Sequence, residues 1–132
     1  MTEEEARTAF RCRQNCTQIV LNQSCSDILT KDMIKNLSAC FEGGMHTGTT
    51  CGAVTGAYMA FGLKFKDPKE IKAKFDKAFL KEFKSLECRG ILGYDLSKED
   101  ELQKIISQNL FSKVCPKAVK FGVDFLHKNS NS

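Results

Sequence analysis

The sequence has no uninterrupted hydrophobic run of the length that a membrane span requires. Its longest apolar stretch, residues 53–63, is broken by Gly56, Tyr58 and Gly62, whereas a spanning helix needs about 20 apolar residues. The chain begins Met-Thr-Glu-Glu-Glu, without the basic and apolar regions of a secretory signal. We therefore expect a cytoplasmic protein with an unprocessed N-terminus and no membrane insertion.

Strand signals are also missing. The sequence shows no alternation of polar and apolar residues and no Asn-Gly or Asp-Gly pair of the kind that marks a β-hairpin. Apolar residues recur three or four positions apart instead, which is the period of an α-helix. With 132 residues, the chain has the length of one domain. These features predict an all-α fold in which residues 1–132 form a single-domain bundle of five or six helices.

The apolar periods and the capping signals place the expected helices along the chain. A Ser97–Asp100 pair resembles a capping box, and Pro68 suits the first turn of a helix. The predicted helices cover residues 3–23, 31–41, 51–62, 68–83, 97–112 and 115–128, with a short turn at 88–92. This reading puts Cys12 and Cys16 on one helix face and Cys40 in the core.

A glycine-rich segment, residues 42–50, separates the second and third of these helices. Its three glycines and three threonines show no apolar period, which predicts a loop with positive-φ positions. Thr49 or Thr50 is expected to cap the helix that follows. That helix is rich in Gly and Ala, so other backbones can approach it closely, and we place it at the centre of the bundle.

The chain contains seven cysteines but no closely spaced cysteine motif. The absence of CxxC, CxxCH and CxxCxxC spacings argues against zinc ribbons, c-type haem attachment and bacterial ferredoxin loops. Cytoplasmic thiols are normally reduced, so a disulfide framework is not expected. The alternative to a functional role is that the cysteines are small buried apolar residues, which applies to at least some of them.

Three cysteines fall in the first turn of a predicted helix: Cys51, Cys88 and Cys115. Unpaired N–H groups and the helix dipole at such a position favour the thiolate. Cys16 is expected inside a helix, on its inward face. Together the four thiols would suit a metal ion or an iron–sulfur cluster, although their spacing alone leaves buried structural thiols as an equal alternative.

Four segments of the chain resemble the CGAxxG family, also called C_GCAxxC. They are NCTQIVL around Cys16, CGAVTGAYMAFGLKF from Cys51, CRGILGYDL from Cys88 and CPKAV from Cys115. The family is a group of bacterial proteins to which redox activity is ascribed, often encoded near transporter genes, with four cysteines in a helical domain of this length. The resemblance implies that these four cysteines are the redox or ligating residues. Cys12, Cys25 and Cys40 match no family cysteine.

Two other polar residues are candidates near these thiols. His46, in the glycine-rich segment, could act as a base or a ligand, although a single loop histidine is commonly solvated. Arg89 could lower the pKa of Cys88 or pair with an acid, and surface solvation is the alternative. Apart from the cysteines, no catalytic acid–base pair is evident, so the sequence does not decide whether the protein is an enzyme.

Three functions are open from the sequence. The first is electron transfer through a metal or iron–sulfur cluster held by Cys16, Cys51, Cys88 and Cys115, which air could destroy during purification. The second is cofactor-free thiol–disulfide exchange, in which Cys51 attacks and another of the four resolves. The third is a non-redox accessory module of a transport system.

The charge pattern bears on partners. Lysines between residues 64 and 84 alternate with apolar residues, as on the wet face of an amphipathic helix, so the net charge of +4 does not indicate nucleic-acid binding. A redox partner protein is expected, and association with a second copy of the chain is left open.

Overall fold

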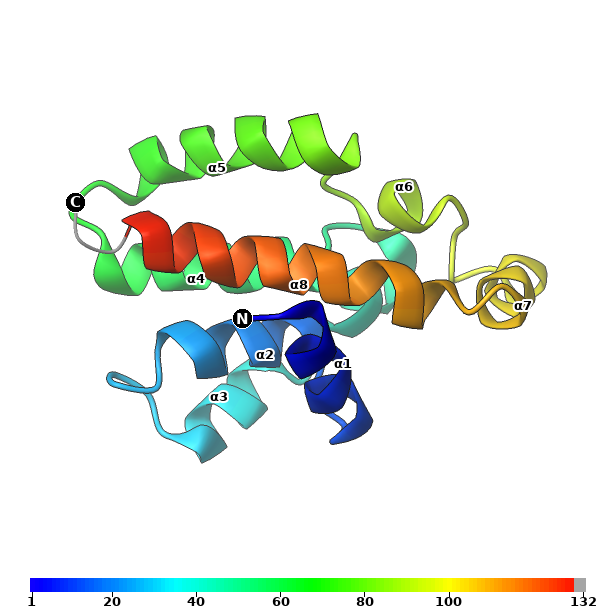
Figure 1. The fold of residues 1–132 in the computed structure, drawn as a ribbon, viewed down its shortest axis with the longest axis horizontal. Helices are drawn as coiled ribbons and strands as arrows, with labels where there is room; N and C mark the ends of the chain where they lie inside the picture. The colour runs from blue at the N-terminus through cyan, green and yellow to red at the C-terminus, as the bar shows by residue number, and fades with distance from the viewer. Residues whose placement is uncertain (130–132) are drawn as a thin grey trace.

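The computed structural model describes residues 1–129, and within them the chain forms nine helices and no strand (Figure 1). The all-α prediction is confirmed, but the count of five or six helices is wrong. The helices are α1 (Glu3–Arg11), α2 (Cys16–Ser24), α3 (Lys31–Ser38), the π-helical turn η1 (Gly44–Gly48), α4 (Gly52–Lys64), α5 (Pro68–Phe83), α6 (Cys88–Leu92), α7 (Glu99–Ser107) and α8 (Leu110–Asn129). The prediction of one domain over residues 1–132 includes 130–132, which lie outside the described part.

The first predicted helix is in fact two helices. Residue Arg13 adopts a left-handed φ of 64° after α1, and the Asn15 side chain caps α2 by accepting a hydrogen bond of 2.8 Å from the Gln18 N–H. Asn favours such a cap over a helix interior because its side chain competes for backbone N–H groups. Cys16 is therefore the first residue of a helix, and Cys12 does not share its face.

The last two predicted helices are shifted relative to the prediction. Helix α7 ends at Ser107, Asn109 takes a left-handed φ of 57°, and α8 begins at Leu110. Cys115 consequently lies inside α8 rather than at its start. The expected Ser97–Asp100 capping box is also absent, because the Ser97 hydroxyl donates to Asp95 instead.

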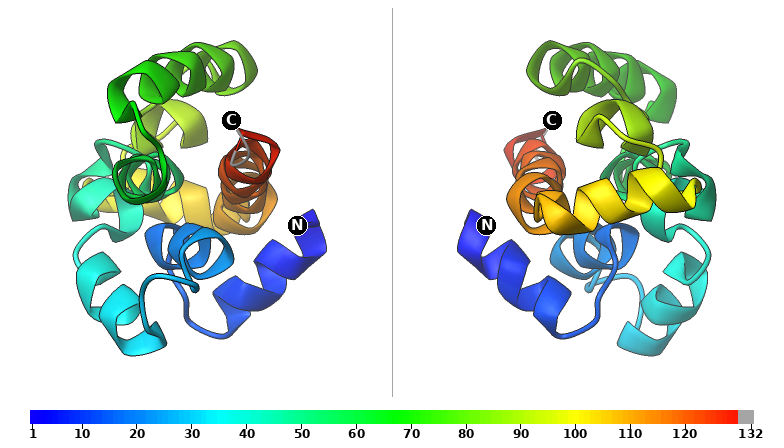
Figure 2. Two further views of the ribbon diagram at one scale, coloured as in Figure 1. Left: turned by 90° about the vertical axis from the view of Figure 1, so that its left-hand side faces the viewer. Right: turned by 90° about the vertical axis from the view of Figure 1, so that its right-hand side faces the viewer.

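Helix α4 is central, as its small residues predicted, and packs against α2, α5 and α8 (Figure 2). At Gly56 a Cβ atom would lie 3.0 Å from the Val20 Cβ and 3.1 Å from the Thr17 carbonyl oxygen. Contacts this short leave no room for a side chain. The glycine thus permits the close approach of α2 and α4.

A cluster of phenylalanines fills the space between α4, α5 and α8. Phe75 and Phe79 of α5 are fully buried, and the Phe75 ring centroid lies 5.5 Å from that of Phe61 and 5.1 Å from that of Phe125. Edge-on arrangements at these distances add to the free energy gained by burial. The predicted buried face of the helix beginning at Pro68 is confirmed.

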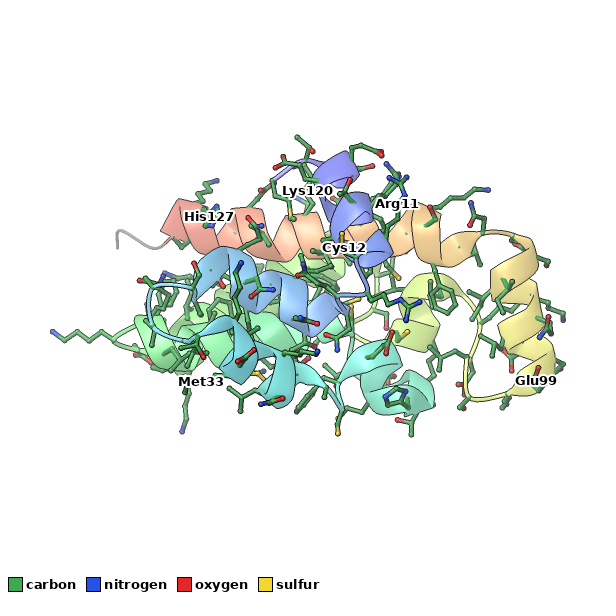
Figure 3. All side chains as sticks on the ribbon, turned by 90° about the horizontal axis from the view of Figure 1, so that it is seen from below. Arg11, Cys12, Met33, Glu99, Lys120 and His127 are labelled. Carbon is green, nitrogen blue, oxygen red and sulfur yellow. The ribbon has the colours of Figure 1, made fainter. Side chains whose placement is uncertain are left out.

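Helix α3 lies at the periphery and packs mainly on α2. Only one of its faces is covered, so Ile34 is fully buried while Met33 and Leu37 are about half exposed. Figure 3 labels Met33 on this helix. Cys40, two residues beyond the helix, is exposed. The prediction that Cys40 belongs to the core is therefore wrong, because the apolar period continued past the point where a neighbouring helix could cover it.

None of the helices within residues 1–129 is long and apolar enough to cross a membrane.

Candidate functional site

One pocket of about 500 Å³ is lined by all four cysteines singled out in the sequence. They come from four separate elements. Cys16 opens α2, Cys51 immediately precedes α4, Cys88 opens α6, and Cys115 lies one turn inside α8. The pocket wall does not include Cys12, Cys25 or Cys40 among its described residues.

The pocket lies where two hydrophobic clusters meet. Cys51 is part of the main core, and Cys16 packs against this core. Cys88 belongs to a smaller cluster formed with Leu92 and Ile105, and Cys115 packs against that one. The four thiols therefore join the large helical core to the smaller α6–α7 unit.

The segments carrying Cys51 and Cys88 are joined by their backbones. Cys51 N–H donates to the Leu86 carbonyl at 2.8 Å, and Cys88 N–H donates to the Thr49 carbonyl at 2.6 Å, on either side of an antiparallel bridge between residues 50 and 87. This two-way link holds the starts of α4 and α6 side by side. Two cysteines 37 positions apart in the chain thus become neighbours.

The glycine after Cys51 controls how closely α2 approaches. A Cβ at Gly52 would lie 2.8 Å from the Cys16 Cβ and 2.9 Å from the Thr17 hydroxyl oxygen. Thr17 in turn donates to the Gly52 carbonyl at 2.9 Å. The missing side chain therefore makes room for Cys16 and the start of α2, an approach that sequence reasoning did not identify.

The glycine-rich segment forms one edge of the pocket. Its positive-φ positions are confirmed and include Gly43, Gly44, Met45 and His46. His46 is exposed and lines the same pocket as the four thiols. The expected threonine cap of α4 is wrong, because Cys51 is the N-cap residue and no side chain caps the helix.

The thiols of Cys51 and Cys88 are stabilised in the protonated form. Burial, followed by the nearby Cys115 thiol, raises the pKa of Cys51 to about 12, against smaller opposing hydrogen bonds from the Ala53 and Val54 N–H groups. Burial, and then the neighbouring Cys51 and Cys115, raises the pKa of Cys88 to about 12. The expectation that Cys51 is an activated thiolate is therefore wrong, since desolvation outweighs the helix start.

Cys16 and Cys115 differ from this buried pair. Their thiols are hydrogen-bonded to each other, which raises the pKa of Cys16 and lowers the pKa of Cys115. This interaction favours the thiol form of Cys16 and the thiolate form of Cys115. Both residues are half-buried, whereas Cys51 and Cys88 are 7 % and 8 % exposed. The more accessible pair thus contains the one thiol of the four whose pKa is lowered.

The other candidates have ordinary surroundings. Arg89 forms an ion pair of 3.0 Å with Glu87 and does not lower the pKa of Cys88. Cys12 and Cys40 are exposed, while Cys25 is fully buried and its pKa is raised by that burial.

The donor set is not arranged for a single metal ion. Within residues 1–129, no group of three or more Cys, His, Asp or Glu side chains is placed to hold one. A cluster of several irons makes a different demand, because its cysteine ligands bind different metal atoms around one cavity. Four thiols lining one pocket satisfy that demand in number and kind.

Comparison with known proteins identifies the family of this chain. No curated protein and no solved structure matches this chain. A family model described as "Putative redox-active protein (C_GCAxxG_C_C)" matches residues 14–129, which include the whole pocket except for its α1 residues. The protein belongs to this C_GCAxxG_C_C family.

Proposed function

We propose that the protein is a thiol–disulfide redox protein in which Cys115 attacks and Cys16 resolves. The observation that carries the proposal is the placement of two half-buried thiols, Cys16 and Cys115, on the wall of one pocket. It is supported by their interaction, which lowers the pKa of Cys115. The thiolate is the attacking form in thiol–disulfide exchange, and a neighbouring thiol is needed to release the product. This assignment replaces Cys51 by Cys115 as the nucleophile.

The exchange is balanced with an organic disulfide as the oxidant. The Cys115 thiolate attacks one sulfur of the substrate, forming a mixed disulfide and breaking the substrate S–S bond, so that one thiolate leaves. Cys16 then gives its proton to the thiolate that has left and attacks the Cys115 sulfur. The Cys16–Cys115 disulfide forms, the second substrate thiolate leaves, and two electrons have passed from the protein to the substrate. A dithiol reductase, as a cytoplasmic partner protein, would restore the pair.

A small organic disulfide suits this pocket better than a protein disulfide does. The reacting sulfurs are recessed among Phe10, Ile91 and Phe111 rather than displayed on the surface. A volume of about 500 Å³ lies in the range of small-molecule sites, which are mostly apolar with a few polar groups. We therefore propose a low-molecular-weight, largely apolar disulfide as the substrate class.

The test measures which cysteines react. Reduced protein is mixed with the neutral disulfide dithiodipyridine, with glutathione disulfide and with insulin, and each rate is divided by that of dithiothreitol. The largest ratio is expected for dithiodipyridine. C115S should abolish the fast phase, and C16S should trap a mixed disulfide on Cys115, visible in the intact mass. C40S removes an exposed thiol outside the pocket and is the matched control.

Peptide mapping of the oxidised protein completes this test. A Cys16–Cys115 disulfide supports the proposal, whereas a bond between any other pair contradicts it. If C16S and C115S both react like the parent protein, the accessory-module alternative gains support instead.

An iron–sulfur cluster held by Cys16, Cys51, Cys88 and Cys115 is the second candidate. It is favoured by one observation that the dithiol reaction does not use, namely that the buried Cys51 and Cys88 line the same pocket. Such a cluster would supply one-electron transfer, and its iron would compensate the charge of thiolates that burial disfavours. Iron and sulfide analysis of protein purified without oxygen tests it, with C51S and C88S expected to abolish binding and C25S expected to retain it.

A further inference from the structure

Helix α8 contains a backbone carbonyl, that of Ser112, whose usual hydrogen-bond donor within the helix is missing. In an α-helix the N–H of residue 116 would donate to the carbonyl of Ser112, but residue 116 is proline, which has no N–H. Helix α8 nevertheless continues through this point, from Leu110 to Asn129. The freed carbonyl belongs to the same two turns that carry Cys115, so whatever satisfies it bears on the position of that thiol.

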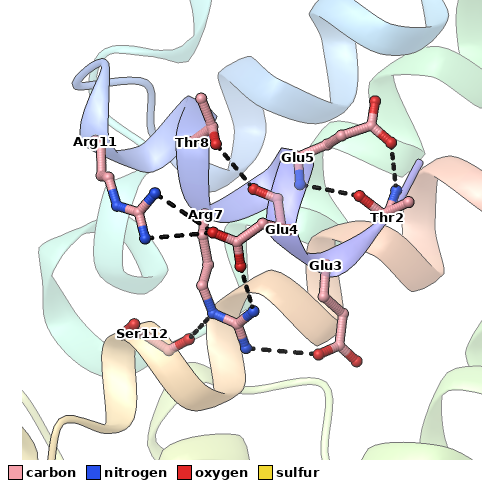
Figure 4. A network of polar contacts seen from close by, with 8 residues as sticks. All are labelled: Thr2, Glu3, Glu4, Glu5, Arg7, Thr8, Arg11 and Ser112. Atoms are coloured by element: carbon pink, nitrogen blue, oxygen red, sulfur yellow. Dashed lines mark hydrogen bonds and ion pairs between the residues drawn. The ribbon is translucent and has the colours of Figure 1, made fainter.

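Arg7 of α1 supplies the missing donor. Its Nε donates to the Ser112 carbonyl oxygen at 3.1 Å, although the two residues are 105 positions apart (Figure 4). The two other guanidinium nitrogens contact Glu4 at 3.1 Å and Glu3 at 3.5 Å. All three nitrogens are thereby used, and the two glutamates fix the plane from which Nε points at α8. The Arg7 side chain is 27 % exposed, so this hydrogen bond is partly shielded from water.

We propose that Arg7 is a positioning residue of the redox site, which replaces the missing Pro116 N–H and so holds the Cys115 turn against Cys16. The proposal rests on the proposed function only in taking Cys115 as the reacting thiol. Helix α1 lies outside residues 14–129, to which the family model matches.

The attachment of α1 does not depend on Arg7 alone, which allows the role to be tested. Ala6 is fully buried in the main core, and the N-terminal ammonium of Met1 lies 3.3 Å from the Asp124 carboxylate of α8. Loss of the guanidinium should thus leave α1 in place and remove one hydrogen bond. A charged donor to a carbonyl is worth enough to change a local opening equilibrium by about tenfold.

A double-mutant cycle isolates this hydrogen bond. R7M removes the donor and keeps most of the apolar stem, while P116A gives residue 116 an N–H that can satisfy Ser112 within the helix. Amide exchange of Val114 and Cys115 should accelerate about tenfold on R7M with proline at 116. In the P116A background the same change should have an effect of less than about threefold. R7K should recover part of the protection.

Arg11 provides the matched control. It lies on the same helix and pairs with Glu4 at 3.4 Å, but no contact joins it to Ser112 among the interactions of the described residues. R11M should therefore leave the exchange of Val114 and Cys115 within about twofold of the parent protein. The circular dichroism of each variant shows whether the helices remain.

A second measurement links the Arg7–Ser112 hydrogen bond to the Cys115 thiol. The pH profile of Cys115 alkylation should shift to higher pH in R7M and return towards the parent profile in R7M/P116A, because the Cys16–Cys115 contact is restored. Equal effects of R7M in both backgrounds, or no effect in either, would overturn the inference. If amide exchange shows the coupling but Cys115 is not preferentially ionised in the parent protein, the proposed function fails and the positioning role of Arg7 stands.

Discussion

The two ends of the bundle are built from the same helices but have opposite characters. Helices α4 and α8 run in the same direction in Figure 1. At their C-terminal ends Phe61 and Phe125 pack into the phenylalanine cluster, whose members Phe61, Phe75 and Phe79 are buried. Near their N-terminal ends Cys51 and Cys115 face a pocket. The comparison teaches that one end supplies stability, whereas the other keeps space and reactive groups at a cost in packing.

Backbone conformation differs in the same way. The thiol end collects left-handed residues other than glycine, including Met45, His46 and Asn109, and such conformations cost about 1 kcal/mol or more each. Among the described residues of α5, α4 and the second half of α8, the helices are regular. Arg13 and Lys84, which follow α1 and α5, are left-handed as well. The strained residues thus lie outside the regular parts of α4, α5 and α8, and two of them, Met45 and His46, belong to the segment at the edge of the pocket.

The largest expected effect on stability comes from a substitution in the phenylalanine cluster. F75A removes a fully buried ring at the centre of the aromatic cluster and should lower the free energy of unfolding by about 3–5 kcal/mol. The alkylation rate of Cys115 at 25 °C should stay within about twofold, provided that the variant is folded. Urea unfolding and thiol kinetics measure the two quantities, and a large loss of Cys115 reactivity in folded F75A would show that the two ends are not separable.

The next largest effect on stability is expected from adding a methyl group beside the four thiols. G52A places a methyl group 2.8 Å from the Cys16 Cβ, so α2 must shift, at a cost of about 1–3 kcal/mol. The Cys16–Cys115 hydrogen bond should weaken with it, raising the pKa of Cys115. G62A is the matched control in the same helix, because nothing lies within 4 Å of its added Cβ. It should stabilise the protein by about 0.5–1 kcal/mol.

The pH dependence of stability sharpens the comparison further. A thiol whose folded-state pKa is raised stabilises the protein fully below its unfolded pKa of about 8.5 and loses this contribution as pH rises towards the folded value. For Cys51 and Cys88 the stabilisation is therefore lost between about pH 8.5 and about pH 12. Each should contribute a slope of about 1.4 kcal/mol per pH unit.

Unfolding of the parent protein, C51A and C88A at pH 8 and pH 10 measures these slopes. Each variant should lose less stability between the two pH values than the parent does. C40A, at an exposed site, should keep the parent slope. A parent protein equally stable at both pH values would contradict the burial of the two thiols.

The smallest expected effect concerns the N-terminal capping box. T2A removes the acceptor for the Glu5 N–H, which Thr2 contacts at 3.0 Å, and should cost about 1 kcal/mol. Because Arg7 is downstream of this cap, α1 should fray without releasing its contact to Ser112. The amide exchange of residues 5 and 6 should accelerate, while that of Cys115 should not. An equal acceleration at Cys115 would show that the Arg7–Ser112 hydrogen bond depends on the whole of α1.

The sequence by itself determined the helical class and much of the helix at residues 68–83. Helical periods need only local spacing, and Pro68 and the buried face of Ile71, Phe75 and Phe79 appear as predicted. The local sequences around Cys16, Cys51, Cys88 and Cys115 likewise identified the family, which the match over residues 14–129 shows. The positive-φ glycine segment was also readable, since Gly43 and Gly44 adopt conformations that other residues avoid.

Tertiary structure alone decided the breaks between helices, the burial and the ionisation of the thiols. Asn15 and Asn109 interrupt apolar periods that continue through them, because capping and a left-handed turn compete with the helix at single residues. The pKa of Cys51 depends on desolvation by residues distant in sequence, which outweighs the local effect of a helix start. The hydrogen bond from Arg7 to Ser112 joins residues 105 positions apart. It replaces the N–H that Pro116 lacks, and local sequence shows only that this N–H is missing. Such contacts exist only once the chain has folded.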